Sequence, residues 1–546
     1  MGRPRYIDYR LPGWRAARYY GVSAAMVEQA TRRRLAGDWR GACGAARVEV
    51  DLDLGAVRDQ YGAGVATAME DDLLHLAPDL MRWHMLGLHT DGSGLLRARH
   101  HVALATYDGG VRLFLRTPAG GRAGERIGLV AGPNRVREED NWTRARHLWD
   151  VRAAHQLLAH AGGGDRTPFV ERDGRRRAVA ELGQPATDPA ARTEQILGLA
   201  DAGQIEEAWA AAGIRVGDDF TAREVPPIDD TRQPLAEIFA CLLPTLVHVA
   251  RAILTAPPAP PEVAVRVPQP HYLWDRTIVK LRLENGEIRA DRAPVAEADS
   301  LPVVPLAHWQ RLADVELLRA GMLGPEELHP LVRAALFPHQ PDPGFHPRVG
   351  RAARKSTEER GYARDRLRRL TPEAWAGEAF PVRCRGVWHR IGWRDGRLTP
   401  LDHTADEVTR ERVMRSLGGA VPTCVTVVDT WLRRHPGKPA RFLRDLRRHT
   451  QLVMLHGRVD ELLRLLDSGL DPALIRDDRG RGLLHHLAKL DNAVPALTRL
   501  LAEGLDINAR DDRDATPLQH VRYQRGSAEL IAAMIDAGAI DPKERG

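Results

Sequence analysis

The sequence predicts a multidomain α+β protein, in which helical segments and several antiparallel β-hairpins precede a short, all-helical repeat array. Three observations support this prediction. The chain has 546 residues, more than one compact core usually contains. Apolar residues at three-to-four spacing give way to short alternating stretches around Asp-Gly and Asn-Gly pairs. A repeated pattern occupies the C-terminal part of the chain.

The composition is that of a globular protein. Hydrophobic residues make up 43% and charged residues 28%, which excludes a disordered, collagen-like or coiled-coil chain. Only five of the 79 basic residues are lysine, a bias typical of a GC-rich bacterial genome. A single arginine is therefore weak evidence of function in this chain.

The charge distribution argues against nucleic acid as the main ligand. The 79 basic and 73 acidic residues are interleaved along the chain, whereas a polyanion binder usually has a face or tail of one sign. A DNA-binding regulator that uses residues 10–40 remains a less favoured alternative. There, a helix capped by Ser23 ends in the basic cluster of residues 32–34, but no partner helix is evident upstream.

We expect a cytoplasmic protein with reduced thiols and no membrane partner. The N-terminus shows no apolar signal segment. The most apolar run, residues 238–254, contains Pro244, His248 and Arg251 and is shorter than the roughly 20 residues that a membrane span needs. The four cysteines are far apart and form no CxxC pair, so neither a disulfide framework nor a cysteine zinc knuckle is indicated: Cys43, Cys241, Cys384 and Cys424.

The order of elements predicts α+β organisation, because hairpins are scattered among helices. Residues 13–90 are predicted to be mainly helical. Further helices are expected at 192–212, 235–254, 407–417 and 425–434. Hairpins are expected at 101–117, 169–181, 272–290 and 382–401, around Asp108-Gly109, Asp173-Gly174, Asn285-Gly286 and Asp395-Gly396.

Proline-rich stretches and composition divide the chain into five predicted regions. Residues 256–261 should be extended and mark a boundary, and residues 338–347 form a second break. The basic run that follows, 348–369, is expected to be an exposed helix or poorly ordered. The predicted regions are 1–165, 166–255, 256–347, 348–440 and 441–546.

A period of 34 to 35 residues marks the C-terminal region. Gly469, Gly504 and Gly538 each follow an apolar doublet, and Asp471, Asp506 and Asp541 are 35 residues apart. Glycine at this position is typical of a left-handed helix C-cap. Thr516 is a natural N-cap and Pro517 a favoured first helical residue, while Leu518 should pack between two helices.

These residues resemble the ankyrin repeat, a β-turn followed by two antiparallel helices. Thr516-Pro517-Leu518-Gln519 matches the start of its first helix, and residues 505–511 match its turn. The middle unit keeps His485 but has Gly482 in place of Thr-Pro, with an extra residue near Asn492. In the first unit only the second helix, 460–466, fits well. The preceding 440 residues faintly resemble N-terminal regions of bacterial ankyrin-repeat proteins.

The resemblance implies a protein partner and no intrinsic chemistry for the array. Its contact residues would lie at turn tips and on the inner helices. The candidate partner-binding residues are Asp478, Arg479, Arg481, Asp512, Arg513, Arg522 and Tyr523. Ordinary solvated surface is an equally good interpretation of these side chains.

No motif nominates a metal, cofactor or catalytic residue. The histidines His84, His89, His100 and His101 lack the spacing of a metalloprotease helix, so we expect structural roles, and what they bind stays open. Cys384, His389 and His403 match no zinc ribbon, and Cys424 is expected to be too remote to join them.

Motifs for phosphate binding and catalysis are also missing. Gly437-Lys438 is followed by Pro439, which excludes a Walker loop, and no GxSxG elbow occurs. A dinucleotide site is not expected either, because Gly62-Ala63-Gly64 lacks the third glycine. The acidic triplet 70–72 is expected to open a helix ahead of Leu73, where the helix dipole favours negative charge.

We therefore expect an adaptor or scaffold protein that acts through its C-terminal array. The alternative from another class is an enzyme or effector with an active site in residues 1–440 that motifs do not reveal.

Overall fold

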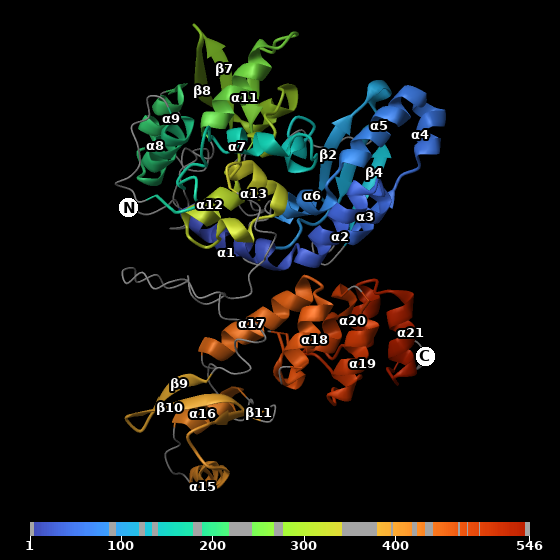
Figure 1. Ribbon diagram of the computed structural model, residues 1–546, viewed down its shortest axis with the longest axis vertical. Coiled ribbons are helices and arrows are strands. Elements are labelled where there is room, and N and C mark those ends of the chain that lie inside the picture. The colour runs from blue at the N-terminus through green and yellow to red at the C-terminus, as the bar shows by residue number, and fades with distance from the viewer. Residues whose placement is uncertain are drawn as a thin grey trace. The chain divides into compact units, whose positions relative to one another are not determined.

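The computed structural model describes residues 5–86, 94–118, 126–133, 140–177, 188–217, 243–266, 277–340, 379–394, 397–417, 423–431, 441–467, 470–477, 479–490 and 492–540 (Figure 1). Helices alternate with small sheets, so the α+β class is confirmed. The chain packs into two compact units, one of residues 1–121 and 126–347, the other of residues 348–546 with 122–125. The predicted basic segment 348–369 lies outside the described residues. The five predicted regions remain a prediction.

The first unit begins with six helices, as the apolar periodicity predicts. They are α1 (Arg5–Tyr20), α2 (Ala24–Leu35), α3 (Trp39–Ala45), α4 (Leu54–Tyr61), α5 (Ala63–His75) and α6 (Pro78–Met85). Ser23 caps α2 as expected, because its hydroxyl accepts the N–H of Met26 at 3.2 Å. A helix does lie upstream of α2, although no partner helix was evident there from the sequence, since α1 ends three residues before Ser23.

A four-stranded sheet in the order β1-β4-β3-β2 accompanies these helices. Its strands are β1 (Val48–Asp51), β2 (His101–Thr106), β3 (Arg112–Arg116) and β4 (Ile127–Gly132). The hairpin predicted at Asp108-Gly109 joins β2 to β3, and Gly109 has a φ of 74°, which favours glycine. The edge pair β1–β4 is parallel.

The second sheet of this unit has the order β5-β8-β7-β6. Its strands are β5 (Ile214–Val216), β6 (Glu262–Val265), β7 (Thr277–Glu284) and β8 (Glu287–Pro294). The predicted turn Asn285-Gly286 joins β7 to β8, with both residues at positive φ. Helices α8 (Pro189–Asp201), α9 (Ile205–Ala212) and α11 (Leu243–Thr255) share one apolar core with this sheet. Residues on both sides of the proline-rich stretch 256–261 therefore contribute to one core.

The hairpin predicted at residues 169–181 is a tight turn rather than a strand pair. A single antiparallel bridge joins Val170 to Arg176, and Gly174 has a φ of 84° at the tip. The turn predicted at Asp173-Gly174 is therefore present, but no strands extend from it within residues 169–177. Residues 178–181 lie outside the described part.

Short helices complete the first unit. They are η2 (Asp108–Gly110), η4 (Arg146–Leu148), η5 (Ala154–Gln156), α7 (Leu157–His160), η8 (Val295–Ser300), η9 (Leu306–His308), α12 (Ala313–Arg319), η10 (Pro325–Glu327) and α13 (Pro330–Leu336).

The second unit starts with a three-stranded antiparallel sheet in the order β11-β10-β9. The elements here are β9 (Phe380–Cys384), β10 (Val387–Arg394), β11 (Arg397–Pro400), α15 (Ala405–Ser416) and α16 (Thr423–Trp431). Strand β10 pairs with β11, and both helices form close to the predicted ranges, while the predicted turn Asp395-Gly396 and residues 432–434 lie outside the described residues. The β9–β10 hairpin was not predicted, because its turn is Arg385-Gly386 rather than an Asn-Gly or Asp-Gly pair.

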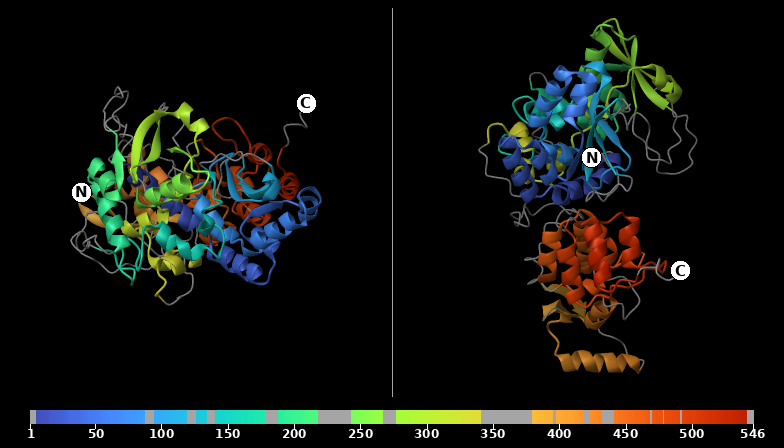
Figure 2. Two further views of the ribbon diagram at one scale, coloured as in Figure 1. Left: turned by 90° about the horizontal axis from the view of Figure 1, so that it is seen from above. Right: turned by 90° about the vertical axis from the view of Figure 1, so that its right-hand side faces the viewer.

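Short helices fill the rest of the second unit and lie side by side (Figures 1 and 2). They are α17 (Arg441–Leu455), α18 (Val459–Asp467), η11 (Pro472–Leu474), η12 (Leu483–Lys489), α19 (Val494–Ala502), α20 (Pro517–Tyr523) and α21 (Ala528–Asp536). Along the chain, α17, η12 and α20 contact one another in succession, as do α18, α19 and α21. The ankyrin identity of this array remains a prediction.

Local features of the array agree with the sequence pattern. Thr516 caps α20 and its hydroxyl accepts the N–H of Gln519, while Pro517 is the first helical residue. Gly504 and Gly538 have φ of 83° and 89°, as the C-cap prediction requires. Gly469 and Asp541 lie outside the described residues. The first repeat of the array is more complete than expected, because a continuous helix, α17, precedes α18.

A buried ion pair joins distant segments of the first unit. Arg18 on α1 donates to Asp314 on α12 at 2.6 Å, with side chains 1% and 0% exposed. The indole N–H of Trp83 on α6 also donates to Asp314, at 3.1 Å. Arg18 lies 4.6 Å from the Trp83 ring centroid. One carboxylate thus connects three helices across 296 residues of sequence.

Replacing this carboxylate should destabilise the first unit. Asp314→Ala leaves the Arg18 charge buried and unpaired, so we expect a loss of about 3–5 kcal/mol in the free energy of unfolding. Hydrogen–deuterium exchange of α1 and α12 peptides measures this loss. The exposed pair Arg116–Asp51 is the control, and Asp51→Ala should cost under about 1 kcal/mol. Equal effects of the two variants would contradict the prediction.

Candidate functional site

Two aspartate-centred turns repeat in the C-terminal array. Asp477 Oδ1 accepts the N–H groups of Arg479 and Arg481 at 2.9 and 3.0 Å. Thirty-four residues later, Asp511 Oδ1 accepts the N–H groups of Arg513 and Ala515, both at 2.9 Å. The backbone closes each loop in the same way, from Asp477 N–H to Arg481 O and from Asp511 N–H to Ala515 O. The two turns are therefore structurally equivalent.

The equivalence extends to the residue three positions after each aspartate. This residue is Gly480 in one turn and Asp514 in the other, with positive φ of 72° and 63°. Aspartate is among the few side chains that tolerate this left-handed conformation. Arg476 donates to the Gly480 carbonyl oxygen at 3.4 Å, and Arg510 donates to the Asp514 carbonyl oxygen at 3.0 Å.

A histidine binds each turn aspartate from the helix that follows. His486 Nε2 is 3.3 Å from Asp477 Oδ2, and His520 Nε2 is 2.9 Å from Asp511 Oδ2. Burial opposes ionisation of Asp511, but hydrogen bonds from the Ala515 N–H, from His520 and from the Arg513 N–H lower its pKa to about 2. Both turns therefore have an ionised carboxylate at their base, because the same kinds of donor hold the Asp477 pKa below its usual range.

The two turns are joined directly. The backbone N–H of Asp512 donates to the carbonyl oxygen of Arg479 at 3.0 Å. A Cβ at Gly480 would meet Asp512 Oδ1 at 2.2 Å, so glycine is favoured there both by its φ of 72° and by the close approach of the turns. His485 adds a second connection, because its Nε2 lies 3.3 Å from the Ala515 carbonyl oxygen. The spacing between the tips is thus fixed by one backbone hydrogen bond and one contact of the His485 side chain.

The structure places the candidate partner-binding residues unequally. Arg479, Asp512 and Arg513 are exposed at the turn tips. Neither the Arg479 nor the Arg513 guanidinium forms a hydrogen bond or ion pair with the described residues. Arg481 is different, because it pairs with Asp477 at 2.7 Å and supports the turn from within.

The remaining candidates lie away from the tips or outside the described residues. Tyr523 ends α20 and its side chain is 83% exposed. Arg522 on the same helix is half-buried and interacts within the chain. Asp478 lies outside the described residues. Sequence reasoning placed Asp511 in the turn motif of residues 505–511 but missed its equivalent Asp477, although their 34-residue spacing is visible in the sequence.

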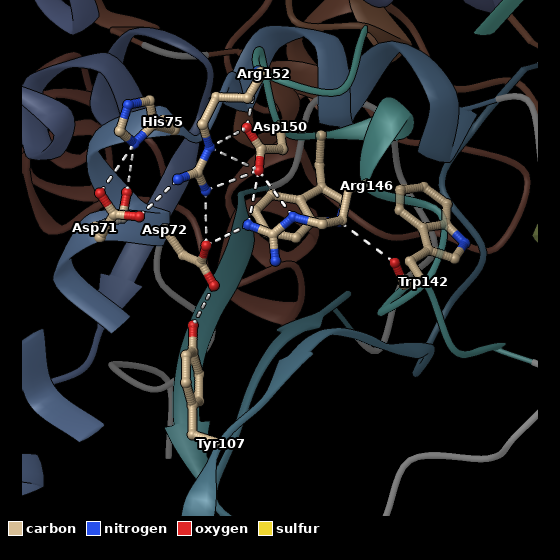
Figure 3. Close-up of polar contacts among 9 residues, drawn as sticks. Asp71, Asp72, His75, Tyr107, Trp142, Arg146, Asp150 and Arg152 are labelled. Atoms are coloured by element: carbon tan, nitrogen blue, oxygen red, sulfur yellow. Dashed lines mark hydrogen bonds and ion pairs between the residues drawn. The ribbon is translucent and has the colours of Figure 1, made fainter. Parts of the chain in front are cut away.

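The acidic triplet of residues 70–72 has a structural role that differs from the expected one. It lies in the second half of α5, which begins at Ala63, so the helix dipole at an N-terminus does not explain it. Asp72 instead pairs with Arg146 and Arg152, and Asp150 accepts bonds from the same two arginines (Figure 3). The Tyr107 hydroxyl donates to Asp72 at 2.9 Å.

The carboxylates of this charge network all pair with arginines of the same network. Asp71 pairs with Arg152 at 2.6 Å and lies 3.5 Å from His75 (Figure 3). Burial and the Asp72 carboxylate raise the pKa of Tyr107, so its hydroxyl stays protonated as a donor. Because each carboxylate faces arginine, the network fits a structural ion cluster better than paired catalytic carboxylates.

The four singled-out histidines do not form one site among the described residues. His84 is buried on α6, and His100 lies 3.4 Å from Asp140. His101 on β2 packs against the Phe114 ring with centroids 5.8 Å apart. His89 lies outside the described residues.

The cysteine at 424 is not remote, which overturns the sequence expectation. Cys424 Sγ is 3.4 Å from His389 Nδ1, and His389 Nδ1 is 2.8 Å from His403 Nε2. Cys384 belongs to the same cluster. The expectation relied on sequence distance, but α16 packs back on the sheet and brings Cys424 to the end of β9.

The array should depend on its first helix. Leu446 and Val453 of α17 are fully buried, and α17 contacts both α18 and η12. A fragment of residues 456–546 lacks that contact surface, so we expect it to unfold at lower denaturant than a fragment of residues 441–546. Circular dichroism during urea titration measures both midpoints. Cooperative unfolding of the shorter fragment at the same midpoint would refute this dependence.

Buried histidines should make the first unit sensitive to acid. His147 and His160 stack with ring centroids 4.4 Å apart, and burial followed by the Arg144 charge lowers the pKa of His308 to about 4. Below pH 6.5 the imidazole of His308 binds a proton in the unfolded chain but not in the folded chain. The free energy of unfolding is therefore highest above pH 6.5 and decreases as the pH falls toward 4.

One substitution tests whether His308 causes this loss of stability at low pH. His308→Gln should reduce the fall in unfolding free energy between pH 6.5 and 4 by about 1.4 kcal/mol per pH unit. Denaturant titrations at several pH values measure this slope. His155→Gln is the control, because that histidine is exposed. An unchanged slope in His308→Gln would show that its protonation is not linked to folding.

The candidate surface thus comprises the tips at Arg479 and Arg513 together with Tyr523. Among the helices that the structure describes, none has the length and apolar character required to span a membrane. Comparison with protein-family models and with solved structures finds no match for this chain.

Proposed function

We propose that this chain is a protein–protein interaction protein, an adaptor or scaffold, that binds its partner through the ankyrin-like C-terminal array of residues 441–546. A cytoplasmic location is part of this proposal and rests on the sequence. The observation that carries the proposal is the pair of equivalent turns, which present Arg479 and Arg513 one repeat apart without a side-chain partner among the described residues.

The chemistry of the exposed residues suits a protein partner. Arginine and tyrosine are enriched at the energetic centres of interfaces, because each combines apolar area with directed hydrogen bonds. An exposed guanidinium without an intramolecular partner can pair with a carboxylate of another protein. Tyr523 adds a large exposed ring to the same array.

The turns also lower the entropic cost of binding. Asp477 and Asp511 each fix two backbone N–H groups of their turn, and the Asp512–Arg479 bond fixes one turn against the next. A partner therefore meets a preformed backbone and has only the arginine side chains to order.

The two alternatives receive less support. For a DNA-binding surface in residues 10–40, Arg32 and Arg33 of the basic cluster are exposed, but Arg33 already pairs with Asp38 at 2.7 Å. Arg10, Arg15 and Arg18 are buried and cannot reach phosphates. In the first 440 residues, the cavity beside Arg311 and Glu316 has a volume of about 10 Å³, so this cavity has room for a single water molecule and is not a substrate site.

Changing the tip arginine and the tyrosine should weaken partner binding. For Arg513→Ala/Tyr523→Ala in the full chain we expect a loss of roughly 1–4 kcal/mol in binding free energy, because both side chains are exposed anchors. Quantitative capture of copurifying proteins and the melting temperature are measured together. The melting temperature should change little, since neither side chain is buried.

Site-specific crosslinking separates a real interface from incidental capture. A photoreactive side chain at position 479 or 513 should crosslink the same protein that the double variant loses. The exposed Arg58 on α4 provides the control position. If the double variant and a chain lacking residues 442–546 capture the same proteins as the intact chain, the array is a structural end-piece and the proposal fails.

A further inference from the structure

Four potential metal ligands meet in the small sheet of the second unit. Cys384, His389, His403 and Cys424 each offer one ligand atom, and all four atoms lie within 4.8 Å of one another. The spacing in sequence is C-x4-H-x13-H-x20-C. They belong to four separate places in the chain, and the fold brings them together.

The sheet register places the first two ligands on one face. Cys384 ends β9 opposite Val387, and His389 on β10 lies opposite Val382. Residues two apart on a strand point to the same face, so Cys384 and His389 share it. The turn between the strands, Arg385-Gly386, takes φ of 50° and 85°, which keeps the two ligands in a tight hairpin.

The other two ligands come from segments that cover this face. His403 follows β11, next to Asp402, whose carboxylate accepts the Arg390 N–H at 2.7 Å and pairs with the Arg390 guanidinium at 2.6 Å. Cys424 is the second residue of α16, which packs on β9 and β11.

The separations of the four ligand atoms lie within about 1 Å of those around a tetrahedral zinc ion. Bonds of about 2.3 Å to sulfur and about 2.0–2.1 Å to nitrogen place neighbouring ligand atoms roughly 3.3–3.8 Å apart. The observed Cys424–His389 separation is 3.4 Å and the His389–His403 separation is 2.8 Å. Shifts of less than about 1 Å would give an ion its bond lengths. Both cysteines are buried and both histidines are half-buried.

We propose that Cys384, His389, His403 and Cys424 bind one structural Zn²⁺ ion. Two thiols release their protons to solvent, and the two thiolates neutralise the dication, while the imidazoles bind as neutral donors. A Cys₂His₂ set fills all four positions of a tetrahedral ion, so the site supports structure and leaves no place for a substrate. Soft thiolates with imidazole favour zinc over magnesium or calcium.

The size of this region supports the need for a metal. Among the side chains that the structure describes there, the apolar core is small and consists chiefly of Ile391, Leu398, Val425, Val428 and Trp431. Other large apolar residues of the same elements are exposed, among them Val387, Trp388 and Met414. Regions of this size often require a metal or disulfide because their core alone is too small.

Metal content of the full chain tests the proposal. Protein purified under reducing conditions should retain roughly one zinc ion per chain. Cys384→Ser/Cys424→Ser should lower that content about tenfold or more, since serine does not replace a thiolate ligand. Cys43→Ser is the matched control, because this buried cysteine lies in the first unit. It should leave the zinc content unchanged.

Cobalt substitution keeps the test independent of variant folding. The wild-type chain, stripped by a chelator and titrated with Co²⁺ alone, should develop the visible absorption of a tetrahedral ion and a thiolate charge-transfer band, both bleached by Zn²⁺. No retained zinc and no such spectrum in the reduced wild-type chain would overturn the proposal. Retention of zinc by the double variant would overturn it too, as would a Cys384–Cys424 disulfide in protein that binds no metal when reduced.

Discussion

A buried carboxylate that accepts hydrogen bonds from several segments is the interaction on which this chain most depends. Asp314 receives bonds from Arg18 and Trp83, which come from helices far apart in sequence. Glu194, with a fully buried side chain, accepts two bonds from Arg166 and the backbone N–H of Phe169. A buried carboxylate without hydrogen-bond partners is strongly unfavourable. Each of these carboxylates therefore fixes the positions of the segments that donate to it.

The same device organises the C-terminal array at a smaller scale. A helix of seven to nine residues buries too little apolar surface to be stable alone, and stacking supplies the remainder. The aspartate at the base of each turn fixes where the next helix begins and receives a histidine from that helix. The negative charge that supports the fold lies inside each turn, and the opposite charges of Arg479 and Arg513 are exposed to solvent.

Features with a local cause were predictable from the sequence. Asp108-Gly109 and Asn285-Gly286 form turns because few other residues accept their backbone angles, and Thr516-Pro517 starts a helix through its own side chain. Arg385-Gly386 shows the limit of this reasoning, because a turn of the same geometry formed without the favoured first residue. The acidic triplet at residues 70–72 shows a second limit. Its partners, Arg146 and Arg152, lie more than 70 residues away.

The sequence alone determined the α+β class, most helices, three of the four expected hairpins and the repeat period, since each depends on neighbours along the chain or on a regular spacing. Tertiary structure decided which charged residues are paired inside the fold and which remain exposed, so that Arg481 supports a turn while Arg513 faces solvent. It also decided that Cys424 joins Cys384, His389 and His403. These groupings arise from long-range packing. The number of residues between two side chains does not indicate whether they meet, because a helix such as α16 can pack back on strands that lie far before it in the sequence.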